Sequence, residues 1–302
     1  MTLHDHMAAA GEQYVADAIA GEQAKNRILT AQVTDLQAKL AATDPGYLTG
    51  WGTPVWRDEF DGTTLDLVKW NARDNIALSY DEAIIYRANN VVNGDGVLHQ
   101  KIGRVASPIL RSGRTRYFTT GYLDTNGKFA QRYGRWEIRA KLPLALNKSA
   151  TFWPAFWLRD SVGNGECDVM EAYGTPQSLH PTPSGQVSMT MHESTNHEAG
   201  TVKIENKVAT TAVNAADGQY HIFTVEWTPA GFRFLVDGVE RWFPKTASYP
   251  WFETAFPGGV NIRMNCQTGS DWHGFYDPTK PEQSVVPAEM TVDYVRVWKY
   301  TA

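Results

Sequence analysis

Trp136-Glu-Ile-Arg-Ala-Lys-Leu142 alternates apolar and polar side chains along its whole length. Successive side chains of a strand point to opposite faces, so this pattern predicts an antiparallel strand with one face in a core. Residues 232–242 read as a hairpin that turns at Asp237-Gly238, because an Asp-Gly pair suits the tight turn between two strands. Residues 291–298 continue the same alternation as a closing strand.

Short strands separated by turns extend over most of the chain. Asn-Gly and Asp-Gly pairs recur from position 61 onward, and no helical period is present after Gly50. Such a run without alternating helices predicts an all-β fold, a jelly-roll sandwich of two antiparallel sheets. We place this domain at residues 54–302, after a linker at 44–53.

Residues 1–43 have a different pattern, without Pro or Trp. Apolar side chains repeat there at alternating spacings of four and three, with Asn26 at an inner position and Glu22 as a weak one. This is the seam of a coiled coil, and its apolar members are Val15, Ile19, Leu29, Val33, Leu36 and Leu40. We expect a helical segment that joins two or three copies through residues 15–40. The alternative is a single amphipathic helix packed on the β domain.

Composition narrows the class of protein. The net charge of −5 does not favour binding to nucleic acid, which relies on clustered Lys and Arg. No apolar run approaches the ~18 residues of a membrane span. The N-terminus lacks the features of a signal peptide, so we expect a protein that is made and folded in the cytoplasm. Cys167 and Cys266 are expected to be buried thiols. The 11 Trp and 13 Tyr suit either a β-sheet core or platforms for sugar rings.

Three carboxylates fall within six residues in Gly165-Glu-Cys-Asp-Val-Met-Glu-Ala172. On a strand, Glu166 and Asp168 share one face, and a β-bulge at residues 169–170 would bring Glu171 to it. Repulsion and partial burial would raise the pKa of at least one carboxyl group. Hydrolysis of a glycosidic bond needs one carboxylate and one carboxylic acid, about 5 Å apart in retaining enzymes. The pattern therefore favours a catalytic strand, with an exposed polar face or a calcium site as the alternative.

This motif resembles the Glu-x-Asp-x-x-Glu signature of glycoside hydrolase family 16, which includes laminarinases, agarases and carrageenases. The resemblance covers about residues 54–300, through stretches at 55–61, 127–143, 153–158, 220–229 and 292–297. It implies a jelly roll with a substrate cleft across its concave sheet. It also implies that Glu166 is the nucleophile, that Glu171 is the general acid and base, and that Asp168 tunes their protonation.

The resemblance further implies a set of substrate-binding residues: Trp153, Trp157, His192, Trp272 and Tyr122. Laminarinases often carry Arg where this chain has Tyr122, and the loop before Trp272 follows the family pattern only loosely. Both a β-1,3-glucan and a β-galactan are therefore candidate substrates. No cofactor is needed for the reaction, although some members bind a structural calcium ion, for which Asp293 is the matching ligand.

The expected function is a retaining, endo-acting hydrolase of a β-linked polysaccharide. The competing interpretation is a carbohydrate-binding jelly roll without activity, which would have little use for three carboxylates. A helical stalk, a sugar-cleaving domain and the absence of a signal peptide together suggest a bacteriophage tail protein that degrades glycans of the host surface. Other virion tail proteins would then be its partners.

Overall fold

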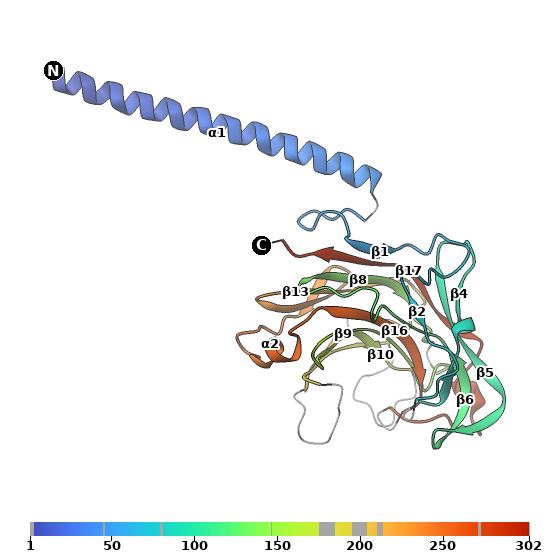
Figure 1. Ribbon diagram of the computed structural model, residues 1–302. Helices are drawn as coiled ribbons and strands as arrows, with labels where there is room; N and C mark the ends of the chain where they lie inside the picture. Colours follow the sequence, from blue (N-terminus) through green and yellow to red (C-terminus); the bar gives the residue numbers. More distant parts are fainter. Residues whose placement is uncertain are drawn as a thin grey trace. The chain divides into compact units, whose positions relative to one another are not determined.

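The computed structural model divides the chain into two compact units, residues 1–54 and 55–302. The first unit contains helix α1 (Leu3–Thr43), which ends where Pro45 and Gly46 follow in the sequence. The second unit is the β domain (Figure 1). The structure describes residues 3–44, 46–78, 81–145, 147–174, 185–194, 204–209, 214–270 and 273–301.

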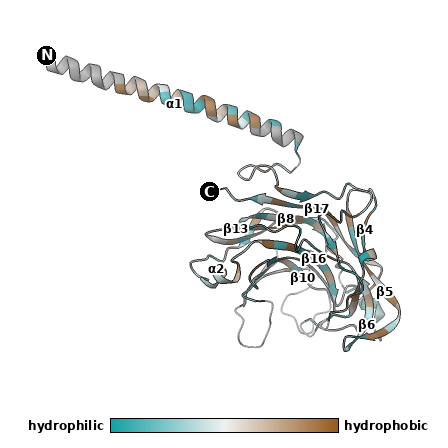
Figure 2. Cartoon of the chain, in the orientation of Figure 1, coloured by the Kyte–Doolittle hydropathy of each residue, from teal (hydrophilic) through white to brown (hydrophobic). Residues whose placement is uncertain are grey.

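Helix α1 presents large apolar side chains to solvent. Figure 2 shows hydrophobic positions among hydrophilic ones along this helix. The large apolar side chains have exposed fractions between 44% and 64% in the single chain. They are Val15, Ile19, Ile28, Leu29, Val33 and Leu36. Among the described residues, no helix combines the length and the apolar character that a membrane span requires.

The β domain is a sandwich of two sheets, which confirms the predicted jelly-roll class. One sheet has ten strands in the described residues, and the other has seven. The larger sheet contains, in order, β15 (Val239–Trp242), β14 (Gly231–Val236), β13 (His221–Thr228), β8 (Gly134–Lys141), β17 (Ala288–Lys299), β5 (Leu98–Arg111), β6 (Arg114–Thr120) and β3 (Ala83–Ile85). Two short strands lie off this path, β1 (Trp56–Asp58) on β17 and β4 (Asn90–Val92) on β5.

The smaller sheet carries the carboxylates. Its order is β12 (Ile204–Ala209), β11 (Val187–His192), β10 (Glu166–Ala172), β9 (Phe152–Asp160), β16 (Val260–Thr268), β7 (Tyr122–Asp124) and β2 (Asn71–Ala72). Helix α2 (Trp251–Ala255) and two single turns, η1 (Arg87–Asn89) and η2 (Pro281–Gln283), lie in the connections. Except for β3 with β6, every strand pair in the described residues is antiparallel.

The two strands and the hairpin predicted from the sequence are confirmed. Residues 136–142 largely coincide with β8, residues 291–298 lie in β17, and the hairpin β14–β15 turns at Asp237 and Gly238. Both turn residues have positive φ (51° and 75°), as the mirror-image turns of hairpins require.

Strand β8 differs from the expectation in one respect, because its polar face is also buried. Arg135 and Glu137 are 9% and 7% exposed. Arg135 pairs with Glu226 at 2.6 Å, and Glu137 accepts a hydrogen bond from Tyr294 Oη at 2.9 Å. In a sheet this wide, long side chains from the neighbouring strands cover the central strand. Its polar side chains therefore form ion pairs and hydrogen bonds with one another and are not exposed to solvent.

The core fills the space between the two sheets. From the larger sheet, Trp136 and Ile138 point into it, and from the smaller sheet Phe156, Leu158 and Cys167 do so, all with no exposed area. Cys266 is also buried, and both thiols are free, as predicted. The packed face of β9 and β10 fixes those strands, so their opposite faces can hold polar side chains in a defined arrangement.

Candidate active site

A β-bulge places the three carboxylates together. The register of β10 against β9 shifts between Asp168 and Met170, and against β11 it shifts between Asp168 and Glu171. Val169 and Met170, the two residues at this shift, are both buried (1% and 0% exposed). This confirms the bulge that the sequence predicts. Glu171 therefore faces the same side as Glu166 and Asp168.

A cleft of about 610 Å³ lies over this face of the smaller sheet. Eleven of its residues come from β9, β10, β16 and β7, and the others come from residues 73–85 and Ser270. The lining includes Arg73, Ile76, Leu78, Ile85, Tyr122, Trp153, Trp157, Arg159, Glu166, Asp168, Glu171, Arg263, Asn265, Gln267 and Ser270. The cleft is thus a mixture of aromatic rings, guanidinium groups and carboxylates, which suits a sugar chain.

Burial raises the pKa of all three carboxyl groups to about 8. For Glu166 and Glu171, repulsion from Asp168 raises the pKa further. The charges of His192 and Arg159 oppose this shift at Glu166. Since neighbouring carboxylates cannot all ionise easily, the group retains at least one proton near neutral pH, and a carboxylic acid and a carboxylate are available together.

His192, the last residue of β11, lies directly across from Glu166 in the strand pairing. Its Nε2 is 2.9 Å from Asp168 Oδ2 and 3.9 Å from Glu166 Oε1. These three side chains are the only group in the described part of the chain with three potential metal ligands within 4.8 Å. His192 thus belongs to the carboxylate cluster, whereas the family resemblance implied a role in substrate binding, which stays a prediction.

Trp153 and Trp157 both line the cleft, and each indole N–H is held by a polar neighbour. Trp153 donates to Glu171 Oε1 at 2.9 Å, and Trp157 donates to Asn265 Oδ1 at 2.8 Å. The Trp153 ring packs against Tyr173, with a centroid distance of 5.4 Å. Trp153 therefore contacts a catalytic candidate directly, in addition to any role as a sugar platform.

Tyr122 is 7% exposed and lines the cleft from β7. Arg263 donates a hydrogen bond to its hydroxyl at 3.3 Å, and the Arg263 guanidinium lies 4.9 Å from the Trp157 ring centroid. Arg73 lies 5.5 Å from the Tyr122 ring and pairs with Asp124 at 2.7 Å. The position that carries Arg in many laminarinases is therefore surrounded by arginines from other elements.

The cleft also contains residues that the motif did not reveal, from β16 above all. Arg263, Asn265 and Gln267 share one face of this strand. The signal was present in Val260-Asn-Ile-Arg-Met-Asn-Cys-Gln-Thr268, which alternates apolar and polar residues. Arg73 and Arg159 had no comparable signal, because only the pairing of the strands brings them to the cleft.

Two predicted residues are not among the described residues that line the cleft. Trp272 lies outside the described residues. Asp293 lies on β17, in the other sheet, and its Oδ2 accepts a hydrogen bond from Arg139 Nη1 at 2.6 Å. A carboxylate held by a guanidinium is a poor calcium ligand, so the residues around Asp293 do not fit such a site as they stand. The calcium ion stays a prediction.

Comparison with known proteins identifies the family of this domain. Residues 54–300 match the family model described as "Beta-porphyranase A-D, GH16 domain". The chain belongs to glycoside hydrolase family 16, and its β domain is a glycoside hydrolase domain.

Two relatives and one solved structure illustrate the similarity. Glucan endo-1,3-beta-glucosidase A1 of Niallia circulans is 32% identical over 277 residues, which cover 81% of this chain and 37% of that protein. The beta-glucanase of Rhodothermus marinus is 31% identical over 268 residues, which cover 82% and 85%. The X-ray structure of the laminarinase from Rhodothermus marinus has a TM-score of 0.64 at 28% identity, covering 82% of this chain and 98% of that one. This chain thus spans little more than a third of the first relative and most of the second.

Proposed function

We propose that the protein is a retaining, endo-acting hydrolase of a β-linked polysaccharide. The observation that carries this proposal is the bulge in β10, which brings Glu166, Asp168 and Glu171 into one cleft with raised pKa values. A cleft whose lining comes from several neighbouring strands of one sheet suits internal bonds of a long chain. No cofactor is needed, because side chains and water complete the reaction.

In the first step, Glu166 attacks the anomeric carbon while the bond from that carbon to the leaving oxygen breaks, and Glu171 gives its proton to that oxygen. In the second step, Glu171 takes a proton from water, whose oxygen attacks the same carbon and releases Glu166. Asp168, held 2.9 Å from His192, lies between the two on the strand and its charge raises the pKa of both. The positive charges near Glu166 favour its ionised form, which suits the nucleophile.

For the substrate, we favour a β-galactan that carries anionic groups. The matching family model is named for porphyranases, and Arg263 in the cleft has no carboxylate within ion-pair distance among the described residues. A guanidinium group binds a sulfate or carboxylate through two parallel hydrogen bonds. A β-1,3-glucan is the second candidate, because two relatives with 31–32% identity are named for glucan hydrolysis.

The test is product release from porphyran, agarose, laminarin and bacterial envelope polysaccharides, comparing the native protein with Glu166→Gln. Early products of mixed length would support endo action, and retention of the anomeric configuration in proton NMR would support the double displacement. A β-glucan as the only substrate cleaved would overturn the galactan assignment. Binding without cleavage by the native protein would favour the non-catalytic carbohydrate-binding module instead.

Helix α1 supports a second role, self-association. In the heptad frame, Ile19, Asn26 and Val33 occupy position a, while Leu29 and Leu36 occupy position d. β-branched residues at a, Leu at d and one Asn at a favour a parallel dimer over the trimer. A multimeric stalk of this kind would suit a phage tail protein assembled in the host cytoplasm with other virion proteins, and this remains a proposal.

Light scattering on the full chain tests the stalk. Leu29→Asp should convert the multimer to a monomer, because it places a charge in the seam. Ile28→Asp is the matched control, since Ile28 is equally exposed in the single chain (60% against 59%) but lies outside the seam. A native chain that is monomeric at micromolar concentration, or equal effects of the two variants, would contradict the proposal.

A further inference from the structure

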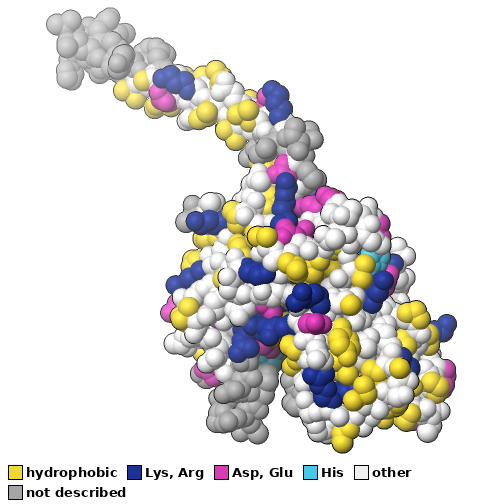
Figure 3. Space-filling model, turned by 45° about the vertical axis from the view of Figure 1, so that its right-hand side comes forward, with side chains coloured by type: hydrophobic (Ala, Val, Ile, Leu, Met, Phe, Trp, Pro, Cys, Tyr) yellow, Lys and Arg dark blue, Asp and Glu magenta, His cyan; other side chains and the backbone are white. Residues whose placement is uncertain are grey.

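The hairpin of β5 and β6 carries an unusual concentration of positive charge. Residues 96–123 contain no Asp or Glu, in a chain whose net charge is −5. The same stretch contains five basic residues, Lys101, Arg104, Arg111, Arg114 and Arg116. Figure 3 shows Lys and Arg side chains interspersed with hydrophobic ones on this side of the domain. A local field of this sign attracts anionic groups.

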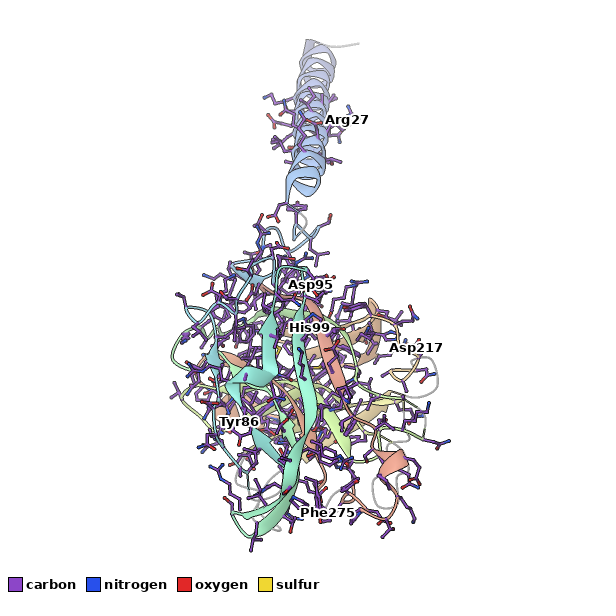
Figure 4. All side chains as sticks on the ribbon, turned by 90° about the vertical axis from the view of Figure 1, so that its right-hand side faces the viewer. Arg27, Tyr86, Asp95, His99, Asp217 and Phe275 are labelled. Atoms are coloured by element: carbon purple, nitrogen blue, oxygen red, sulfur yellow. The ribbon has the colours of Figure 1, made fainter. Side chains whose placement is uncertain are left out.

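Aromatic rings accompany two of these arginines. The Arg104 guanidinium lies 4.8 Å from the ring centroid of Phe118 and 4.6 Å from that of Tyr276. The Arg114 guanidinium lies 4.1 Å from Phe275, which is 38% exposed and lies beside the far end of the hairpin (Figure 4). We call the group Arg104, Arg114, Phe275 and Tyr276 the arginine–aromatic strip.

The strip continues one end of the cleft. Tyr276 N donates to Glu82 Oε2 at 2.8 Å, and Glu82 N donates to Thr268 O at 2.7 Å, two residues before Ser270 of the cleft lining. On the other side, Arg111 holds Asn75 with two hydrogen bonds of 2.6 Å, next to Ile76 of the lining. A polysaccharide that leaves the cleft at this end therefore reaches the hairpin.

Among the described residues, the carboxyl groups next to Arg104 and Tyr276 are either buried or paired with a lysine. Within the described part of the chain, Arg104 has no carboxylate at ion-pair distance. Asp81 and Glu82 directly precede β3, beside β6, and are buried (0% and 3% exposed). Asp277, beside Tyr276, pairs with Lys280 at 3.4 Å.

We infer that the arginine–aromatic strip is a secondary binding surface for sulfated or carboxylated units of the polysaccharide, beyond the cleft. Guanidinium groups pair with planar or tetrahedral anions, and aromatic faces suit the CH faces of sugar rings. The inference rests on the proposed function, since it concerns the same polysaccharide chain. The strip would hold the chain during hydrolysis without contacting the reacting bond.

The experiment compares the native protein with the double variant Arg104→Ala/Arg114→Ala on porphyran, which is sulfated, and on a sulfated tetrasaccharide cut from it. We expect KM for porphyran to rise about fivefold, because exposed charge contacts are individually weak, while kcat is unchanged. The tetrasaccharide fills only the cleft, so its KM should not change. The matched control is Arg233→Ala. Arg233 lies on β14, near the opposite edge of the same sheet, and its guanidinium also lies over an aromatic ring, 4.8 Å from the centroid of Phe243.

An unchanged KM for porphyran, or an equal rise for the tetrasaccharide, would overturn the inference while leaving the hydrolase intact. Affinity electrophoresis in a porphyran gel tests binding at the strip separately from cleavage in the active site. Each variant carries Glu166→Gln in this experiment, so that nothing is cleaved. Loss of retardation in the double variant, but not in Arg233→Ala, would support the strip even if porphyran proved not to be cleaved. Equal retardation of all three chains would refute it. Urea unfolding of each variant checks that the domain is intact.

Discussion

Replacing Glu166 with Gln should abolish hydrolysis and also stabilise the fold at neutral pH. The pKa of Glu166 is raised from 4.5 to about 8, mainly by burial. Between these values the folded protein holds a proton that the unfolded chain has lost, so the free energy of unfolding falls as pH rises through this window. An amide has no charge to bury and avoids this penalty.

The magnitude follows from the distance between pH 7 and the ordinary pKa. With about 1.4 kcal/mol per pH unit, the penalty approaches about 3 kcal/mol at pH 7. Two effects change the free energy that Glu166→Gln can recover. Asp168 and Glu171 still repel each other in the variant, and the amide no longer attracts the positive charges of His192 and Arg159. We therefore expect Glu166→Gln to unfold with a free energy about 1–3 kcal/mol higher at pH 7.

Urea unfolding followed by Trp fluorescence measures this difference, because residues 1–43 contain no Trp and the signal reports largely on the β domain. The difference in the free energy of unfolding between the variant and the native protein should be small at pH 4.5 and should increase up to pH 8. Glu282→Gln, which changes an exposed glutamate of the same domain, is the control. A variant that is no more stable at pH 7, or a gap that does not widen with pH, would refute the reasoning.

Three further predictions concern the site and its support. Glu171→Gln should lose turnover of polysaccharide but retain a burst of product from aryl glycosides, whose leaving groups need no proton; rapid-quench kinetics would detect it. Trp153→Phe removes a hydrogen bond that lowers the pKa of Glu171, so the alkaline limb of the pH profile of kcat should move upward; an unmoved limb would disprove this link. Trp136→Ala should reduce stability by about 3–5 kcal/mol, measured by urea unfolding, because it empties a fully buried site between the sheets.

Local patterns predicted much of this structure. The strands around 136–142 and 291–298, the turn at Asp237-Gly238 and the bulge after Asp168 all follow from side-chain alternation and its single interruption. These features depend on interactions between residues that are close together in the sequence, so they can be predicted from the sequence alone. The jelly roll then follows from the need to bury one face of every strand.

Features that depend on strand pairing were not predictable. The hydrogen bond from Trp153 to Glu171 arises from the register of β9 against β10 after the bulge, 18 residues apart in the sequence. Arg159 lies on the cleft because it pairs with Glu166, and the polar face of β8 is buried because long side chains from its neighbours cover it. Each is a property of the sheet, not of any segment.

The bulge in β10 also determines which length changes this strand can tolerate during evolution. Loss of one residue at 169–170 would restore a regular strand and leave the last glutamate on the cleft face, since it would then follow Asp168 by two positions. Loss of Cys167 would instead turn either the first glutamate or the remaining pair toward the core. Deletion of one residue at 169–170 should therefore keep the carboxylates on the cleft face, whereas deletion of Cys167 should inactivate the enzyme. Searches for related enzymes should accordingly accept two spacings of the final glutamate.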